Sequence, residues 1–333
     1  MLLGYPLGDL ALLIGISLLI CITVCTLAME AAVLFTPAFL FVFPRIVTGF
    51  PTLTVNEAIG LSLFVEFFGY TSSVSGYWFR EQIDFNAAAR ILTITIPLAV
   101  VARIGSYFVP SSSLLALFGI LLLALAVVLY YSHEHGGTRA CMLCGDSLAM
   151  MEGKADADYC CSAQAEGTGI TDGGQPEYAP RTTFRRREAE GEPLIFDLAD
   201  KAIKGLAGIL AGLLGIAVGE LTNTMLTVRK RLPVQLAVGT AAFVLHVTIL
   251  AALLANLVIL RIQPPGLNVA GFSIPLGVGA ILAPTVIIGG QVGSLINSKM
   301  SEETAIRVMI VAYMLVGLFV LGRILVLGGG AAH

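Results

Sequence analysis

The sequence is poor in charged residues. Only 12% of its 333 residues are Asp, Glu, Lys or Arg, whereas soluble domains contain about 25%. The chain therefore has too little charge to cover a water-facing surface of its size. This shortage excludes a soluble enzyme, a disordered chain and a nucleic-acid-binding protein with a basic face. Hydrophobic residues make up 57% of the sequence, which is typical of a helical protein with several membrane spans.

Cysteine is also scarce, and basic residues are missing near the start of the chain. Six cysteines are too few for a disulfide scaffold. Cys21 and Cys25 lie in an apolar run and are interpreted as small buried residues. No Lys or Arg precedes Arg45, so the first apolar run lacks the basic leader of a cleaved signal peptide. We expect it to remain as a membrane segment.

Long apolar runs predict the membrane spans. A spanning helix needs about 20 mostly apolar residues. The first run, 8–44, would form a straight helix of roughly 55 Å, whereas the hydrocarbon core is about 30 Å thick. We therefore expect this run to break between Glu30 and Pro37, since proline disrupts helices. The sequence predicts eight spans, located in the runs 8–44, 57–79, 87–109, 112–131, 203–228, 234–260, 272–297 and 304–327.

Most of the charge is concentrated in one central segment. Residues 132–202 contain 20 of the 41 charged residues of the chain. This distribution predicts a first membrane repeat (1–131), a polar cysteine-containing loop (132–202) and a second membrane repeat (203–333). The predicted fold is thus an all-α polytopic membrane protein of about eight transmembrane helices, arranged as two four-helix repeats with a polar central insert.

Short sequence correspondences support the internal repeat. Ala58-Ile59-Gly60 and Phe64-Val65 match Ala237-Val238-Gly239 and Phe243-Val244 at the same spacing, and Gly105-Ser106 matches Gly293-Ser294. Transporters built from repeats place the substrate site at the repeat interface, on interrupted helices near the membrane midplane.

The basic residues leave the orientation of the chain open. Among the short loops, 229–231 and Lys299 favour one set of connections as cytoplasmic, whereas Arg80 and Arg90 favour the other set. A re-entrant segment or an additional crossing at 30–37 would change the parity of the count.

Ionisable residues inside a bilayer are costly, so each is a functional hypothesis. Glu220 lies in a glycine-rich stretch and precedes Thr222 and Asn223, which can bind a ligand where a helix unwinds. Glu30 occupies the comparable place in the first half. The alternatives are a position at the membrane interface or a structural buried pair.

Three further polar residues are candidates for the same site. Glu66 lies among phenylalanines and must pair, bind a proton or face a cavity. Arg103 can pair with Glu66, bind an anionic substrate or extend to the lipid headgroups. Gln291 lies in a second glycine-rich stretch, which close helix packing also explains. His246 could carry protons, but it is interpreted as a buried structural histidine. The predicted substrate or coupling-ion residues are Glu30, Glu66, Arg103, Glu220, Thr222, Asn223 and Gln291.

The central loop contains a candidate zinc site. Cys141 and Cys144 form a C-x2-C pair, and Cys160 and Cys161 follow. Four thiolates can bind zinc tetrahedrally, but adjacent cysteines fit poorly on one ion. Redox pairs and free thiols remain alternatives. No other cofactor is expected.

The motifs of the second half resemble the sulfite exporter TauE/SafE family. The resemblance rests on the segment from Gly208 through Gly212, Gly215 and Gly219 to Glu220, on Pro233, on Ala237-Val238-Gly239-Thr240 and on Ile288-Gly289-Gly290-Gln291-Val292-Gly293. Pro37, Ala58-Ile59-Gly60-Leu61-Ser62 and Gly105 repeat the pattern more weakly in the first half. The chain departs from the family at Ala28-Met29-Glu30-Ala31, where glycines are few, and in its cysteine-containing insert.

The resemblance implies a multi-pass plasma-membrane transporter that exports sulfite or another small organosulfur anion and is not an enzyme. Its expected partners are a small anionic substrate and the lipid bilayer, without nucleic acid. Proton coupling is a hypothesis from the buried carboxyl groups. The alternatives are a membrane-anchored sensor or scaffold and a metal-ion transporter that uses the central cysteines. A membrane-embedded enzyme is disfavoured because no H-E-x-x-H or G-x-S-x-G motif is present.

Overall fold

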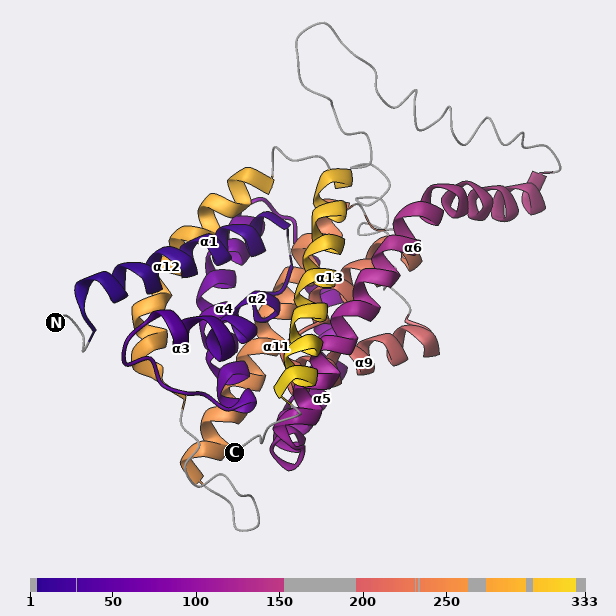
Figure 1. Ribbon diagram of the computed structural model, residues 1–333. Coiled ribbons are helices and arrows are strands. Elements are labelled where there is room, and N and C mark those ends of the chain that lie inside the picture. Colours follow the sequence, from indigo (N-terminus) through magenta and orange to yellow (C-terminus); the bar gives the residue numbers. More distant parts are fainter. Residues whose placement is uncertain are drawn as a thin grey trace, which may run out of the picture. The chain divides into compact units, whose positions relative to one another are not determined.

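The computed structural model describes residues 5–27, 29–152, 196–230, 232, 234–262, 274–297 and 302–327. Every regular element in these ranges is a helix (Figure 1), which confirms the all-α class. Contacts divide the chain into a unit of residues 1–126 and 195–333 and a second unit of residues 127–194. Apart from residues 127–152, the features described below belong to the first unit, to which both membrane halves contribute.

The helices follow the apolar runs of the sequence. In chain order they are α1 (Leu7–Leu27), α2 (Ala32–Pro37), a π-helical turn (Ala38–Val42), α3 (Phe43–Ile46), α4 (Val55–Phe79), α5 (Phe85–Gly105), α6 (Ser111–Glu152), α9 (Leu198–Leu214), α10 (Val218–Thr224), a second π-helical turn (Met225–Arg229), α11 (Val234–Ile262), α12 (Leu276–Asn297) and α13 (Glu302–Leu327). Among the described residues, six helices are long and apolar enough to cross a membrane, and they belong to α1, α5, α6, α11, α12 and α13.

The first apolar run folds as a helical hairpin. α1 and α2 are separated by a break that contains Glu30. The chain then returns to the start of α1, because the Thr48 backbone N–H donates to the Asp9 carboxylate over 2.9 Å. The base of this first hairpin is therefore at Asp9 and Thr48, and its tip is at residues 29–31.

The second half begins with a hairpin of the same kind. Gly215 ends α9 with a φ of +73°, and Ala217 precedes α10 with a φ of +83°. A left-handed conformation is uncommon for alanine, so this tip is locally strained. At the base, the Arg229 guanidinium pairs with Asp197 at 2.8 Å and with Asp200 at 2.6 Å. The two limbs therefore start and end on the same side of the structure.

Asp200 is the buried centre of this base. Its carboxylate also pairs with the Lys230 ammonium, and its side chain is fully buried. Burial alone would raise the pKa of Asp200, but hydrogen bonds from Lys230 and Arg229 lower it well below its usual range. The base is therefore held by a carboxylate that stays ionised at neutral pH.

One expectation about these segments is wrong, and another is confirmed with a different cause. The interpretation of 203–228 as one continuous span is wrong, because the chain breaks at 215–217 and returns to Asp200. A hairpin and a single span have the same apolar composition, so hydropathy does not separate them. The expected break in the first run is present at Glu30, at the start of the interval 30–37. Proline does not cause it, because Pro37 remains helical and is followed by the π-helical turn.

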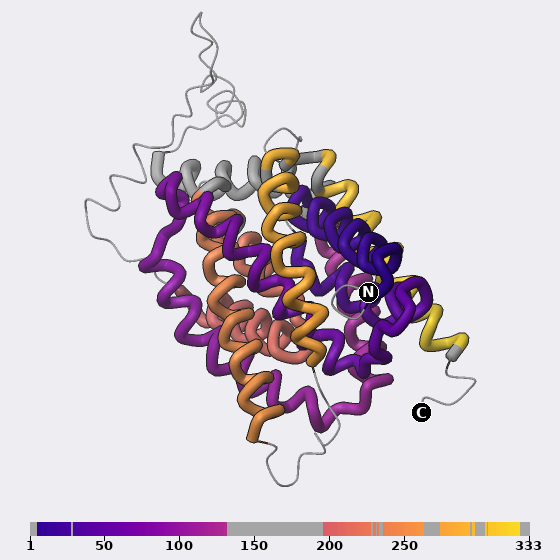
Figure 2. Tube along the Cα trace, turned by 90° about the vertical axis from the view of Figure 1, so that its left-hand side faces the viewer, coloured from indigo at the N-terminus to yellow at the C-terminus, as the bar shows by residue number. Residues whose placement is uncertain are grey.

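The helices of the two halves pack against each other in matching pairs. α1 packs on α12 and α9 packs on α5 (Figures 1 and 2), while α4 contacts α12 and α11 contacts α5. The two contacts that a hairpin makes with the other half, α1 with α12 and α9 with α5, each contain a glycine. A Cβ on Gly293 would lie 2.6 Å from Cys25 Cβ, and one on Gly212 would lie 2.1 Å from the Ala99 carbonyl oxygen. The absence of a side chain therefore sets the distance between these helices.

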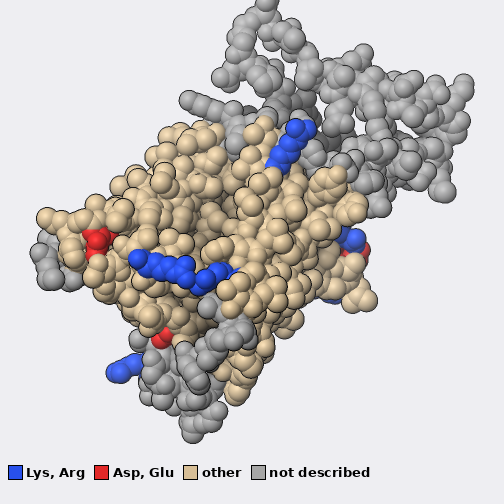
Figure 3. Space-filling view, in the orientation of Figure 1, with Lys and Arg blue, Asp and Glu red and all other residues tan. Residues whose placement is uncertain are grey.

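Large apolar side chains face outward from several of these helices. Leu19, Val101 and Leu315 are all more than 60% exposed. Figure 3 shows a face on which charged side chains are few and widely separated. Such a surface suits contact with lipid, in agreement with a multi-pass membrane protein.

Candidate functional site

The tips of the two hairpins meet in the interior, and Glu30 joins them. This residue is 1% exposed. Its Oε1 atom accepts a hydrogen bond of 2.7 Å from the Gly219 N–H, and its Oε2 atom accepts one from the Ala217 N–H. The carboxyl group of the first tip thus occupies the first backbone N–H groups of the helix that leaves the second tip.

Glu66 makes the corresponding contact with the first hairpin. It lies in the middle of α4 and is 1% exposed. Its Oε1 atom accepts a hydrogen bond of 2.9 Å from the Ala31 N–H, immediately before α2. Its second oxygen has no hydrogen-bond partner among the described residues. Each hairpin tip is therefore capped by a carboxyl group from another segment.

Glu220 lies close to this pair but is not equivalent to Glu30. It is the third residue of α10, whereas Glu30 lies in the break before α2. The Tyr313 hydroxyl of α13 donates to its Oε1 atom, and its Oε2 atom has no described partner. Thr222 is 2% exposed, and the Asn223 side-chain oxygen is buried without a described partner. The sequence-predicted residues of α10 therefore lie beside the tips.

The three glutamates have no positively charged partner among the described residues. None of them forms an ion pair with a Lys, Arg or His of the described residues, whose ion pairs involve Asp197 and Asp200. Burying an unpaired carboxylate is costly, and three adjacent carboxylates would also repel one another. The expected pair of Glu66 with Arg103 is not formed, since the hydrogen bonds of Arg103 go to Asn56 and Asn256.

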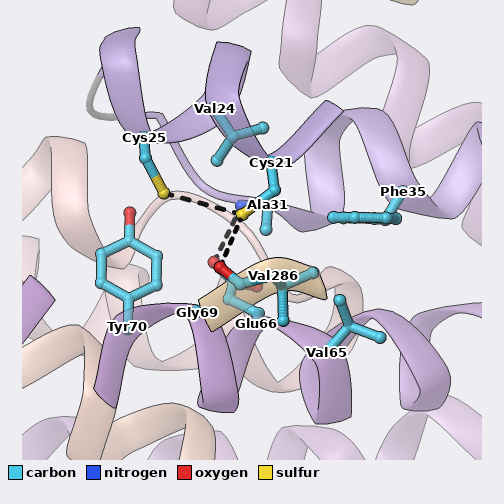
Figure 4. A pocket seen from close by; sticks show the side chains of 10 residues that line it. All are labelled: Cys21, Val24, Cys25, Ala31, Phe35, Val65, Glu66, Gly69, Tyr70 and Val286. Atoms are coloured by element: carbon cyan, nitrogen blue, oxygen red, sulfur yellow. Dashed lines mark hydrogen bonds between the residues drawn. The ribbon is translucent and has the colours of Figure 1, made fainter. Parts of the chain in front are cut away.

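A narrow cavity lies against Glu66 (Figure 4). Its lining residues are Cys21, Val24, Cys25, Ala31, Phe35, Val65, Glu66, Gly69, Tyr70 and Val286. The two thiols of α1 are 4.0 Å apart, and Cys21 donates to the Val286 carbonyl over 3.2 Å. The Tyr70 hydroxyl donates to the Met29 carbonyl at the first tip over 3.3 Å.

Several of these residues were not candidates from the sequence. Cys21 is buried, as expected of a small apolar residue, but both thiols also line the cavity. Tyr70 and Tyr313 carry no sequence signal, because a tyrosine in an apolar helix does not reveal where its hydroxyl points. Asn256, an amide inside an apolar run, could have been noticed as a buried polar residue.

The remaining candidates make other contacts. Arg103 is fully buried in the last turn of α5. Gln291 is exposed on α12 and donates to the Ser72 carbonyl over 3.3 Å. His246 stacks on the Phe67 ring with a centroid separation of 4.8 Å. None of these contacts involves one of the three glutamates.

The cysteines of the central loop lie outside the part that carries described side chains. Cys141 and Cys144 fall within α6, but their side chains are not described, and Cys160 and Cys161 lie outside the described residues. Within the described ranges, no group of three or more His, Cys, Asp or Glu residues could hold a metal ion. The zinc site of this loop stays a prediction.

Comparison with known proteins identifies a family for nearly the whole chain. The family model for Sulfite exporter TauE/SafE matches residues 13–320, which include the second hairpin, most of the first hairpin with its tip, and the three glutamates. No curated protein and no solved structure matches the chain.

Proposed function

The chain belongs to the sulfite exporter TauE/SafE family, a family of membrane transporters, and from this premise we propose that it exports sulfite or another small organosulfur anion across the plasma membrane. We propose further that proton binding at the glutamate cluster is coupled to anion movement. The observation that carries this proposal is the contact of the Glu30 carboxyl with the backbone N–H groups of Ala217 and Gly219.

These N–H groups are suited to an oxyanion. Interrupted helices in transporters direct the N–H groups at their free ends toward anionic substrate groups. Both limbs begin at a hairpin tip. The limb 32–46 begins beside the middle of α4, and the limb 218–229 begins beside the middle of α11. In this conformation Glu30 and Glu66 supply the negative oxygens at the two tips. A sulfite or sulfonate oxygen offers similar acceptor chemistry.

Competition between carboxylate and substrate provides the coupling. A hydrogen bond to an ionised carboxylate is about twice as strong as one to a neutral group. Proton binding to Glu30 therefore weakens its hold on Ala217 and Gly219 and frees both N–H groups for the anion. Anion and proton are then bound at the same time, so they move together.

The matched helix pairs support the finer architecture as well. We propose that the halves are two four-helix repeats in which the first helix of each half forms a hairpin that enters the membrane and returns. In such repeats α1 corresponds to α9, α4 to α11 and α5 to α12. The contact α1–α12 then corresponds to α9–α5, and the contact α4–α12 corresponds to α11–α5. In this arrangement α1 is a hairpin limb, although it is long and apolar enough to span. The membrane is then crossed by α4, which contains Glu66, and by α5, α6, α11, α12 and α13.

Two returning hairpins also remove the conflict among the basic residues. Under this topology one membrane face receives the helix ends that carry Arg80, Arg90, Lys201, Lys204, Arg229, Lys230 and Arg307. The opposite face receives Arg45, Arg103, Arg261 and Arg323. The excess of basic residues favours the first face as cytoplasmic.

Flux measurements test the transport proposal. Uptake of labelled sulfite and labelled methanesulfonate into proteoliposomes should saturate, and it should be faster when the external, anion-containing solution is the more acidic one. Methanesulfonate stays ionised in the more acidic solution as well. Faster uptake of methanesulfonate therefore cannot arise from passive entry of a neutral acid. Protein-free liposomes are the control. Absence of saturable uptake for both anions would refute the proposed function.

Labelling of single cysteines tests the hairpins. In a variant without the native cysteines, Cys introduced at Gly8 and Thr52 should react with a membrane-impermeant maleimide from one side of the membrane. Cys introduced at Leu198 and Lys230 should react from the other side, because each pair marks one hairpin base. Permeabilised cells give the total reactivity of each site. Labelling of Leu198→Cys and Lys230→Cys from opposite sides would mean that this segment crosses the membrane.

A further inference from the structure

Arg103 forms a separate cluster at the end of α5. Its side chain is 0% exposed. The Nη2 atom donates to the Asn56 carbonyl over 2.8 Å, and the Nε atom donates to Asn256 Oδ1 over 3.0 Å. The Tyr107 hydroxyl donates to the same Asn256 oxygen, and the guanidinium carbon lies 5.4 Å from the centroid of the Tyr107 ring. The cluster thus joins α4, α5 and α11.

Two hydrogen-bond donors of this cluster are buried without a partner among the residues that the structure describes. They are Arg103 Nη1 and Asn256 Nδ2. The orientation of the Asn256 amide follows from its neighbours, since its oxygen receives the bonds from Arg103 and Tyr107 and a flipped amide would place donor against donor. The Asn256 nitrogen is therefore the free group. Asn56 Oδ1 is an acceptor of the same cluster that also has no partner in the described part of the chain.

The positive charge of Arg103 is not neutralised by an acidic residue in the described part of the chain. Its hydrogen bonds go to a carbonyl and an amide. The nearest acid along α4 is Glu57, whose carboxylate accepts hydrogen bonds from the Thr54 N–H and hydroxyl. The connection from α11 to α12, residues 263–273, has no Asp or Glu in its sequence. An unpaired buried guanidinium is costly unless an anion or polar ligand joins it.

We propose that Arg103 and Asn256 form a second anion-binding site, which takes a small oxyanion of the sulfite or sulfonate class. Arg103 Nη1 and Asn256 Nδ2 are the donors, and the guanidinium supplies the charge. The guanidinium fork suits paired oxygens better than a point charge does. A Cβ on Gly60 would lie 2.5 Å from Asn256 Nδ2 and 2.9 Å from Ile274 Cδ1. In this conformation the donors are enclosed, so the anion enters when the packing around Ile274 opens.

The site is distinct from the hairpin tips. Asn56 precedes Glu66 by ten residues on α4, which corresponds to about 15 Å along a helix. Arg103 lies in the last turn of α5 and is therefore close to one membrane face. In the proposed topology this is the face opposite the basic one. An exported anion would then leave the tips and meet Arg103 before release, and this assignment rests on the proposed function.

Asn256→Asp is the decisive variant. Aspartate has the shape of asparagine and retains the oxygen that accepts from Arg103 and Tyr107, but it replaces the free donor by a negative oxygen. The variant supplies the missing counter-ion from within the chain. We expect the ligand-free variant to unfold at a higher temperature than the wild type, because the buried charge is now paired. The same carboxylate should exclude the external anion.

Equilibrium binding of labelled sulfite to the purified full-length protein in detergent measures the site. Asn256→Asp should bind at least about tenfold more weakly than the wild type, or with one site fewer per chain, as expected for the loss of a charge-assisted hydrogen bond. Arg103→Gln should lose the same component. Arg90→Gln, an exposed arginine on the same helix, should bind like the wild type and serves as the matched control.

The outcomes separate this site from the transport proposal. Identical binding isotherms for the wild type and a folded Asn256→Asp would overturn the inference, as would a wild type that binds no sulfite, sulfate or methanesulfonate. In the latter case the free donors hold water only. Arg103-dependent binding in a protein without saturable flux would refute the proposed function but retain the anion site. Saturable flux without Arg103-dependent binding would refute the anion site at Arg103 but retain the proposed function.

Discussion

Glu30→Gln should reduce uptake of sulfite driven by a pH gradient by at least about tenfold, the effect expected when a charge-assisted hydrogen bond is lost. Both carboxyl oxygens of Glu30 accept backbone N–H groups, from Ala217 and from Gly219. Glutamine has one acceptor oxygen and one donor group. Its NH2 group would stand at one of the two acceptor positions and oppose a backbone N–H, and glutamine cannot exchange a proton. The variant therefore loses the step in which proton binding releases the tip.

The same variant should retain anion binding, because it removes the carboxylate that competes with the substrate. The measurement is uptake of labelled methanesulfonate with and without an acidic external solution, together with equilibrium binding to the purified protein. Glu57→Gln is the matched control. Glu57 is 8% exposed on α4 and caps the helix at Thr54, a role that glutamine also fulfils. Full pH-dependent uptake by Glu30→Gln would show that this carboxyl is structural.

Gly212→Ala should destabilise the protein by on the order of 2 kcal/mol, in the range of overpacked helix contacts. The added Cβ would lie 2.1 Å from the Ala99 carbonyl oxygen and 2.8 Å from Ala102 Cβ. Ala99 is fully buried in α5, so neither helix can yield without moving its backbone. Alanine favours a helix by roughly 1 kcal/mol over glycine, but this gain is smaller than the cost of the clash.

Gly15→Ala provides the comparison for this effect. Gly15 lies inside α1, and a Cβ there meets no atom within 4 Å. We expect an unchanged or slightly higher unfolding temperature for Gly15→Ala and a clearly lower one for Gly212→Ala, both measured by intrinsic fluorescence in detergent. Since α9 carries the second hairpin tip, Gly212→Ala should also reduce flux. Equal unfolding temperatures for the two variants would mean that α9 and α5 are not in close contact.

Composition and hydropathy alone determined the class of this protein. Few charges and long apolar runs predict a multi-pass helical membrane protein, and the motifs from Gly208 to Glu220 and from Ile288 to Gly293 indicate the family that matches residues 13–320. The length of the run 8–44 required a break, and a break is present at Glu30. Buried carboxyl groups were identifiable as candidates, because a charge inside a bilayer is costly wherever its partner lies.

Tertiary structure decided where those segments go and what each candidate touches. The run 203–228 returns to its start because Asp200 pairs with Arg229, and apolar composition does not distinguish a hairpin from a span. Glu30 meets N–H groups that lie 187 and 189 residues away in the sequence, and no local pattern specifies such a contact. Arg103 lies apart from Glu66 and joins Asn256 because α5 packs on α11. Spacing along one helix predicts which residues share a face, but only the packing of helices determines which faces meet.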